Sequence, residues 1–452
     1  MRATLAFAFA ALLPNWAWGH GGQPRVVRLS FPPQLEGGYW AITDVQGLYA
    51  ADADGFQWLC DDAVARNAVF QAVVLVADDT RHWLVATESG LFRTDDGGCN
   101  FTPCTGPVAN QVPVGLWQNP EDRAEVLTST QSPGDGNDLY RTEDGGLTWT
   151  PAGLSANGIA HDVLRSPARA DRVYVVDTHS ARRSDDGGRT FVDIALGPPA
   201  LDVMPLEFRL LAGHPTHADE VWAIVRRFPE TTVVRSQDAG ETWVPLLTLA
   251  DPPSGFAFDR DARRVLLTTE FDGTRRSEDG GDTWTPVPEV VPMLGCLTLQ
   301  PGTNRLWGCS NVTFTGPWVI GHSDDFGATW TPALSSYTEV HRPWACDAQS
   351  ATATACAGLC SGLPPGTPCA GPDAGVVPVV DAGQPVDDAG PPVSTPDAVV
   401  PERSPDAAVT PPIAAKKANA GACAALPGSS SSPALWPLWV GCLCAARRRS
   451  RK

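Results

Sequence analysis

The stretch Arg141-Thr-Glu-Asp144-Gly-Gly146-Leu-Thr-Trp149 is one of six related copies of a short motif that recurs along the chain. All six copies share the pattern Ser/Thr-x-Asp-x-Gly-x-x-Trp/Phe, and successive aspartates are 48, 42, 52, 41 and 46 residues apart. A repeat of this size indicates a fold built from copies of one supersecondary unit. The recurring positions include Asp96, Gly98, Asp144, Gly146, Trp149, Asp186, Gly188, Asp238, Gly240, Trp243, Asp279, Gly281, Trp284, Asp325, Gly327 and Trp330.

Each residue type in the motif has a role in a tight turn. The glycine can adopt a positive φ angle without a Cβ clash. The aspartate carboxylate can accept backbone N–H bonds inside the turn, and the Ser/Thr hydroxyl can bind the same loop. The closing aromatic residue offers a large apolar face to a neighbouring sheet. Because an alternating run such as 137–141 precedes the turn, the motif predicts a β-hairpin.

The motif resembles the Asp box, or BNR repeat, of sialidases, sortilin-type receptors, xyloglucanases and related β-propellers. The resemblance covers roughly residues 25–335. It implies that each box joins the third and fourth strands of a propeller blade at the outer rim. The box residues then serve their own hairpins, so the resemblance specifies the fold better than the function.

A seventh, degraded copy lies at 49–58, where Gly55 and Trp58 keep their spacing but Ala53 occupies the aspartate position. Apolar runs between the boxes supply the other strands of each unit, giving four strands per repeat. We therefore expect an all-β fold, a seven-bladed β-propeller of four-stranded antiparallel blades, over residues 20–337. The segment 25–31 could open the first blade or complete the last one, so the sequence leaves the closure of the ring open.

Composition limits the partners of the chain. The net charge of −18 argues against nucleic acid and anionic membrane surfaces, since both require positive footprints. No pattern indicates a cofactor, and we expect a monomer. His214 and His217 have a loose metal-like spacing in a turn between strands, but no third ligand is evident. We interpret them as surface histidines and expect no metal.

The first residues resemble a secretory signal. An apolar run at 5–13 precedes small residues that end at Gly19, where cleavage is expected. Export would allow disulfides. Cys296 and Cys309 lie on neighbouring predicted strands and are expected to pair, whereas Cys99 and Cys104 flank a box hairpin and could pair locally.

Four more cysteines lie close together just after the propeller, in an expected collar at 338–369. They are Cys346, Cys356, Cys360 and Cys369. We expect two bridges among them, because no C-x-x-C spacing favours a metal. Cys60 is left without an obvious partner in the ring.

The C-terminal part changes composition sharply. Residues 370–420 are rich in Pro, Ala and Asp and predict a disordered stalk. Residues 421–452 combine Cys423, a short apolar stretch and a terminal basic cluster, which resembles the myxobacterial C-terminal sorting signal. The resemblance implies processing near Cys423, with anchoring at the cell surface or outer envelope, or release. This segment is the only membrane contact we expect, although its apolar stretch of about 13 residues is short for a bilayer span.

Two classes of glycosidase can be compared with the sequence. A sialidase needs an arginine triad and a Tyr–Glu nucleophile pair, and Tyr337 near Glu339 is the one such proximity at an edge. A xyloglucanase-like enzyme needs two carboxylates facing across a cleft. Asp162 and Glu207, at the entry ends of inner strands, are the best pair, and Asp259 falls at the far end. We interpret these groups as solvated channel carboxylates rather than catalysts.

The leading hypothesis is an exported, cell-surface-displayed, non-enzymatic binding or scaffold module. Its partner would be an unknown glycan or protein at the channel mouth, contacted by the longer loops at 132–137 and 226–230. The alternative is a divergent glycoside hydrolase of sialidase or xyloglucanase type. The directions in which Asp162, Glu207 and Arg209 point discriminate between the two hypotheses.

Overall fold

The structure is a computed structural model that describes residues 24–359, apart from gaps at 36, 67, 133–136, 155–159, 178–179, 199–206, 289–293 and 311–315. The expected signal peptide with Gly19, the stalk at 370–420 and the tail with Cys423 lie outside the described residues, as do Cys360 and Cys369. Within these ranges, no helix has both the length and the apolar character needed to cross a membrane.

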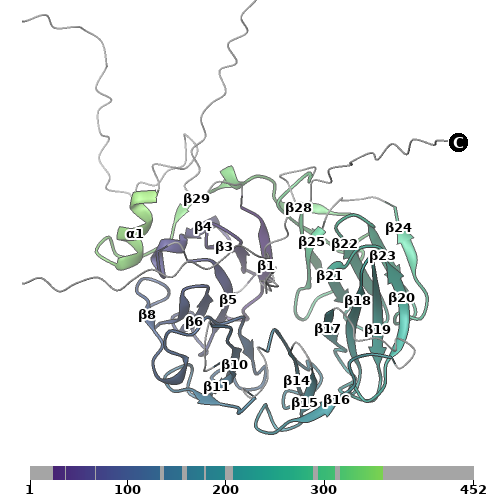
Figure 1. Cartoon of the computed structure of the whole chain (residues 1–452). Helices are drawn as coiled ribbons and strands as arrows, with labels where there is room; N and C mark the ends of the chain where they lie inside the picture. The colour runs from purple at the N-terminus through teal and green to yellow at the C-terminus, as the bar shows by residue number, and fades with distance from the viewer. Residues whose placement is uncertain are drawn as a thin grey trace, which may run out of the picture. The chain divides into compact units, whose positions relative to one another are not determined.

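The chain forms seven sheets arranged as blades around a ring (Figure 1). In chain order, each set of four strands makes one antiparallel blade, and we name its strands A to D from the centre outwards. Strands A of neighbouring blades contact each other, as β21 and β25 do. The structure therefore confirms the expected all-β, seven-bladed propeller.

Blades 1 to 4 contain the following strands: β1 (Val26–Ser30), β2 (Tyr39–Thr43), β3 (Leu48–Asp52) and β4 (Gly55–Leu59); β5 (Phe70–Leu75), β6 (Trp83–Thr87), β7 (Gly90–Thr94) and β8 (Thr102–Pro103); β9 (Trp117–Gln118), β10 (Val126–Ser129), β11 (Leu139–Thr142) and β12 (Thr150–Pro151); β13 (Asp162–Arg165), β14 (Val173–Val176), β15 (Ala181–Ser184) and β16 (Val192–Ile194).

Blades 5 to 7 contain β17 (Glu207–Gly213), β18 (Val221–Arg227), β19 (Glu230–Ser236) and β20 (Val244–Leu249); β21 (Pro253–Phe258), β22 (Val265–Thr269), β23 (Thr274–Ser277) and β24 (Thr285–Val287); β25 (Leu294–Leu299), β26 (Leu306–Ser310), β27 (Ile320–Ser323) and β28 (Thr331–Leu334). The remaining elements are the short 3₁₀ helices η1 (Asp61–Ala63), η2 (Gly106–Val108) and η3 (Tyr337–Glu339), strand β29 (Val340–Pro343) and helix α1 (Ala351–Leu359).

Strands B are the most buried elements. Every residue of β14 and β22 is buried, because both faces of a blade pack against neighbouring blades. A strand covered on both faces needs a continuous apolar run rather than an alternating one. This explains the segments Val173–Val176 and Val265–Thr269 directly from their sequence.

Each of the six boxes joins strands C and D through one repeated set of hydrogen bonds. In blade 3, the Thr142 hydroxyl donates to Asp144 at 2.8 Å and accepts the Gly146 N–H at 2.8 Å. The N–H and hydroxyl of Thr148 donate to the two Asp144 oxygens at 2.9 and 2.6 Å. The same pattern surrounds Asp186, Asp238, Asp279 and Asp325, and Asn100 replaces the threonine at Asp96.

The predicted seventh box is wrong. Strands β3 and β4 pair as far as Asp52 and Gly55, so only two residues connect them. Asp52 accepts the Asp54 N–H at 2.9 Å, which is a local turn bond. Because Ala53 has no carboxylate and the connection is short, the box network cannot form, although the blade itself does.

The box glycines also contact the neighbouring blade. A Cβ atom added to Gly281 would lie 2.1 Å from the Trp222 ring on strand B of the preceding blade. Leu84 and Leu266 on strands B stand in the same way against Gly146 and Gly327, whereas a Cβ atom on Gly188 would meet Leu127 only at an ordinary contact distance of 3.5 Å. The glycine thus serves two purposes, a positive φ angle and close packing between blades.

No blade of the ring combines its four blade strands from both ends of the propeller, since β1–β4 form blade 1 and β25–β28 form blade 7. Strand β1 pairs with β2, so the segment 25–31 opens the first blade. The aromatic rings of Tyr39 in blade 1 and Trp307 in blade 7 pack with centroids 4.6 Å apart across the junction. The chain then continues from blade 7 to the outer edge of blade 1, where β29 adds a fifth, parallel strand beside β4 (Figure 1).

We call residues 340–359 the strap. After β29, Trp344 packs on Trp83 of blade 2 and donates to the Gly97 carbonyl at 2.8 Å. Thr352 at the start of α1 donates to the Gly98 carbonyl at 2.6 Å. The strap therefore holds blades 1 and 2 from the outside, next to the closure of the ring.

The disulfides only partly follow the expected pairing. The structure joins Cys296 to Cys309, which are paired residues of β25 and β26. The local Cys99–Cys104 bridge and a bridge within the collar are wrong for the described residues. Cys99 bonds to Cys346, Cys60 bonds to Cys356, and Cys104 is free and buried. The strap brings cysteines distant in sequence together, which local spacing cannot reveal.

Candidate functional site

The structure brings Asp162 and Glu207 to the same mouth of the channel. Asp162 begins β13 and Glu207 begins β17, the inner strands of blades 4 and 5. The Arg209 guanidinium contacts both carboxylates, with Nε 3.8 Å from Asp162 and Nη1 3.6 Å from Glu207. Arg226, near the end of strand B in blade 5, reaches Glu207 at 3.3 Å. The predicted pair is therefore bridged by an arginine.

Asp162 is the more buried of the two carboxyls, with its side chain 15% exposed against 34% for Glu207. Burial raises its pKa, although Arg209 and the Leu210 N–H favour the charged form. The Leu210 N–H donates to Asp162 Oδ2 at 2.6 Å. One oxygen of Asp162 is thus fixed by the backbone of the next blade, which ties blades 4 and 5 together.

Tyr337 lies apart from this pair. It belongs to η3 beyond blade 7, and its ring packs 6.1 Å from that of Tyr49 in blade 1. Burial is the main cause that raises the pKa of the Tyr337 phenol well above its usual value. Glu339 accepts the N–H groups of Ser335 and Ser336 at the start of η3. The Tyr–Glu proximity is therefore a capped turn, and no sialidase-like nucleophile pair forms there.

Two exposed phenylalanines occupy the turns between strands B and C. Phe228 and Pro229 form the two-residue turn of blade 5, and Phe271 lies in the corresponding turn of blade 6. Their exposed fractions are 79% and 75%, whereas most large apolar side chains of the ring are buried. The B–C turns share the mouth with Asp162 and Glu207, because strand A begins where strand B ends.

The blade 5 turn projects from this mouth. Strands β18 and β19 have seven residues each, against five in β22 and four in β23. From the equivalent pairs Val221–Ser236 and Val265–Ser277, the blade 5 hairpin is three residues longer, so at about 3.3 Å per residue it extends roughly 5 Å further than its neighbour. The longer loop predicted at 226–230 is wrong, because strand pairing continues to Arg227 and Glu230 and leaves a two-residue turn, and Phe271 was not predicted as a contact residue. The position of Phe271 inside the turn 270–273 is a sequence signal that could have identified it, because an aromatic side chain in such a turn does not reach the core.

His214 and His217 acquire a third neighbour in Glu220, and the possible ligand atoms of the three lie within 4.8 Å of one another. However, His214 Nδ1 accepts the N–H groups of Thr216 and His217 at 3.2 and 3.1 Å. A neutral ring that accepts at Nδ1 carries its proton on Nε2, so neither nitrogen has a free lone pair for a metal. Burial lowers the His214 pKa and favours this neutral form.

These groups therefore stabilise the turn, and we assign no metal to them. Glu220 accepts the Trp222 indole N–H at 3.0 Å. The interpretation of His214 as a surface residue is wrong, because its ring packs on Phe258 with centroids 5.1 Å apart and is buried.

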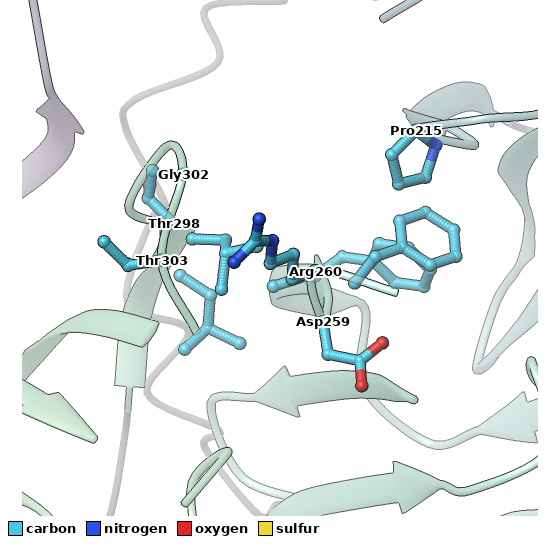
Figure 2. A pocket seen from close by; sticks show the side chains of 11 residues that line it. Pro215, Asp259, Arg260, Thr298, Gly302 and Thr303 are labelled. Atoms are coloured by element: carbon cyan, nitrogen blue, oxygen red, sulfur yellow. The ribbon is translucent and has the colours of Figure 1, made fainter. Parts of the chain in front are cut away.

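The opposite mouth holds a pocket of about 350 Å³ (Figure 2). It lies over the A–B turns of blades 5, 6 and 7, with Pro215, Arg260 and Thr303 among its lining residues. Asp259 stands at this far end, as predicted. Its oxygens accept the Arg264 N–H at 3.0 Å and the Arg264 guanidinium at 2.8 Å, so the carboxylate is bound within its own turn.

Comparisons with known proteins identify the fold. No protein-family model matches the chain, and no curated protein matches it. An ancestral GH74 enzyme is similar in structure, with a TM-score of 0.52 and 13% identity over 68% of this chain and 46% of that chain. The extracellular domain of a putative one-component system from B. thetaiotaomicron gives a TM-score of 0.50 and 12% identity, over 66% and 38%.

The GH74 enzyme of Niastella koreensis aligns with 20% identity and a TM-score of 0.48, over 69% of this chain and 54% of that chain. The chain thus spans about half the length of these GH74 enzymes. The similarity to the ancestral GH74 enzyme and to the extracellular domain shows a shared fold and nothing about activity. The three disulfides independently indicate an exported protein, because such bridges persist in oxidising compartments.

Proposed function

We propose that this protein is a non-enzymatic, surface-displayed module that binds a glycan at the mouth carrying the B–C turns. The observation that carries the proposal is the exposure of Phe228 and Phe271 on adjacent blades of this mouth. Both rings lie in B–C turns and therefore at the same mouth, which makes this mouth the candidate interaction face. The apolar C–H face of a sugar ring packs well against an aromatic ring. This contact does not require any charged group to lose its hydration.

The charged groups at the mouth fit binding better than hydrolysis. Arg209 and Arg226 surround Glu207 and present guanidinium N–H donors, each side chain about 35% exposed. Guanidinium donors hold hydroxyl oxygens by directional hydrogen bonds. Aromatic side chains with a few polar groups nearby are the usual composition of a small-molecule site.

A glycoside hydrolase is the second candidate, and the raised pKa of Asp162 is the observation that favours it. A general acid must be protonated while its partner stays ionised. Against this, the Arg209 guanidinium lies between the two carboxylates, where a glycosidic bond would have to enter. We therefore place hydrolysis second.

Surface display is part of the proposal. It rests on the tail at 421–452, with its cysteine, apolar stretch and basic cluster. The protein would be anchored in the outer envelope through this tail, or released after processing near Cys423. Fractionation of cells that express the full chain or a chain ending at 420 tests this part, since only the full chain should stay with the cells.

The glycan proposal is tested on a panel of immobilised polysaccharides. The Phe228→Ala/Phe271→Ala variant should lose about tenfold or more in affinity, as loss of a buried aromatic contact costs roughly 1–2 kcal/mol. The matched control is Leu147→Ala, which removes a 60% exposed apolar side chain from a box turn at the rim. Binding that is unchanged in the phenylalanine variant, or equally weakened in the control, would refute the assignment of this mouth.

A further inference from the structure

The pocket at the far mouth has features that the proposed function does not use. Strand A of each blade ends there and turns into strand B, so this mouth is opposite the one with Phe228. Small-molecule sites in proteins span roughly 300–1,000 Å³. At about 350 Å³, the pocket suits a ligand of one ring rather than an extended chain.

Arg260 supplies a cation that has no ion-pair partner among the residues the structure describes. Its side chain is exposed, and no ion pair or hydrogen bond of Arg260 occurs within the residues that the structure describes. The adjacent Asp259 is occupied by Arg264 at 2.8 Å. Figure 2 shows the Asp259 carboxylate directed away from the Arg260 guanidinium, which extends toward the side of Gly302 and Thr303.

Arg260 and Arg263 are both exposed and make no side-chain ion pair within the described residues, but only Arg260 lines the pocket. In the next blade, Arg305 binds Asp324 at 2.7 Å, so an acidic partner is available even to exposed arginines of these turns. The guanidinium fork matches a carboxylate in geometry and binds it through two parallel N–H···O bonds. Charge complementarity therefore points to an anionic ligand.

The walls of the pocket add two further constraints. Phe256, Leu297 and Pro215 give it an apolar wall. Thr303 is bound within its own turn, since its hydroxyl donates to Gln300 and accepts the Arg305 N–H. Thr298 also lines the pocket, and its hydroxyl makes no such bond within the described ranges. It is thus a polar group suited to a ligand hydroxyl.

We propose that this pocket binds a uronic acid, a sugar residue that carries a carboxylate. Arg260 binds the carboxylate, the C–H face of the ring packs on Phe256, and Thr298 holds a ring hydroxyl. A neutral sugar would leave Arg260 unpaired, and a simple carboxylate would leave the apolar wall and Thr298 unused. The proposal goes beyond the glycan site at the other mouth, because the two sites share no residue.

The test is isothermal titration calorimetry with methyl β-D-glucuronide and, for comparison, methyl β-D-glucoside. Wild-type protein should bind the glucuronide at least tenfold more tightly than the neutral glucoside. Arg260→Gln should abolish this preference. The matched control is Arg263→Gln, an exposed arginine of the same turn that does not line the pocket and should leave it unchanged.

Several outcomes would overturn the proposal. Equal affinity for the two glycosides, or no detectable heat with the glucuronide, would exclude a uronic acid site. Equal losses in Arg260→Gln and Arg263→Gln would show general charge attraction only. Equally tight binding of acetyl-glutamate would assign the site to a carboxylate without a sugar. The Phe228→Ala/Phe271→Ala variant should bind the glucuronide normally, so failure here is distinguishable from failure of the proposed function.

Discussion

Two adjacent glycines of one box provide a sharp test of how the blades are held together. Gly280 and Gly281 both have positive φ angles, +71° and +97°. Alanine at either position costs about 1–2 kcal/mol in backbone strain. Only Gly281 faces a neighbour, because its added Cβ would lie 2.1 Å from the fully buried Trp222 ring, whereas Gly280 has nothing within 4 Å.

The Trp222 ring must therefore move in Gly281→Ala, and overpacking of this kind costs about 1–3 kcal/mol more. We expect Gly281→Ala to lose roughly 2–5 kcal/mol in the free energy of unfolding and Gly280→Ala about 1–2 kcal/mol. Urea titration followed by tryptophan fluorescence measures both. Equal losses in the two variants would refute the reasoning that box glycines serve as packing contacts between blades.

Three further predictions concern sulfur chemistry and pH. Non-reducing peptide mapping should find Cys60 linked to Cys356; a peptide with Cys99 linked to Cys104 would contradict the strap. Burial raises the pKa of the free Cys104 thiol to about 11, so iodoacetamide at pH 8 should alkylate it only after unfolding; rapid labelling of the folded protein would show that the site is open. Hydrogen bonds from Thr283 lower the pKa of Asp279 to about 2, below its value of about 3.9 in an unfolded chain. The contribution of this box to stability is therefore complete above pH ~4 and lost as the pH falls toward 2, and Asp279→Asn should weaken the pH dependence of the urea midpoint in that range.

The blade architecture was predictable because the boxes encode it locally. Asp144, Gly146 and Thr148 complete their network within a few residues, so the sequence pattern carries the whole interaction. The B strands were equally predictable from the sequence, because continuous apolar runs such as Val265–Thr269 reflect burial on both faces of the blade. The degraded copy at 49–58 shows the limit, because a spacing of Gly and Trp without the carboxylate gave a different turn.

Long-range arrangements were not predictable. The strap returns to blades 1 and 2, and its bridges span sequence separations of 296 and 247 residues. No local pattern records which cysteines such a return brings together. The candidate site was predictable only in part, because it also depends on contacts between residues far apart in the sequence. The order of strands placed Asp162 and Glu207 at one mouth, but the position of Arg209 between them depends on packing of adjacent blades.

The central claim is that the mouth with Asp162 binds a glycan without cleaving it. The most direct measurement is release of reducing ends from xyloglucan, with a fluorogenic sialoside assayed in parallel, for wild-type protein and Asp162→Asn. We predict no product above the blank from either protein, while polysaccharide binding persists in both. Steady turnover by the wild type that disappears in Asp162→Asn would contradict the account and establish a glycosidase.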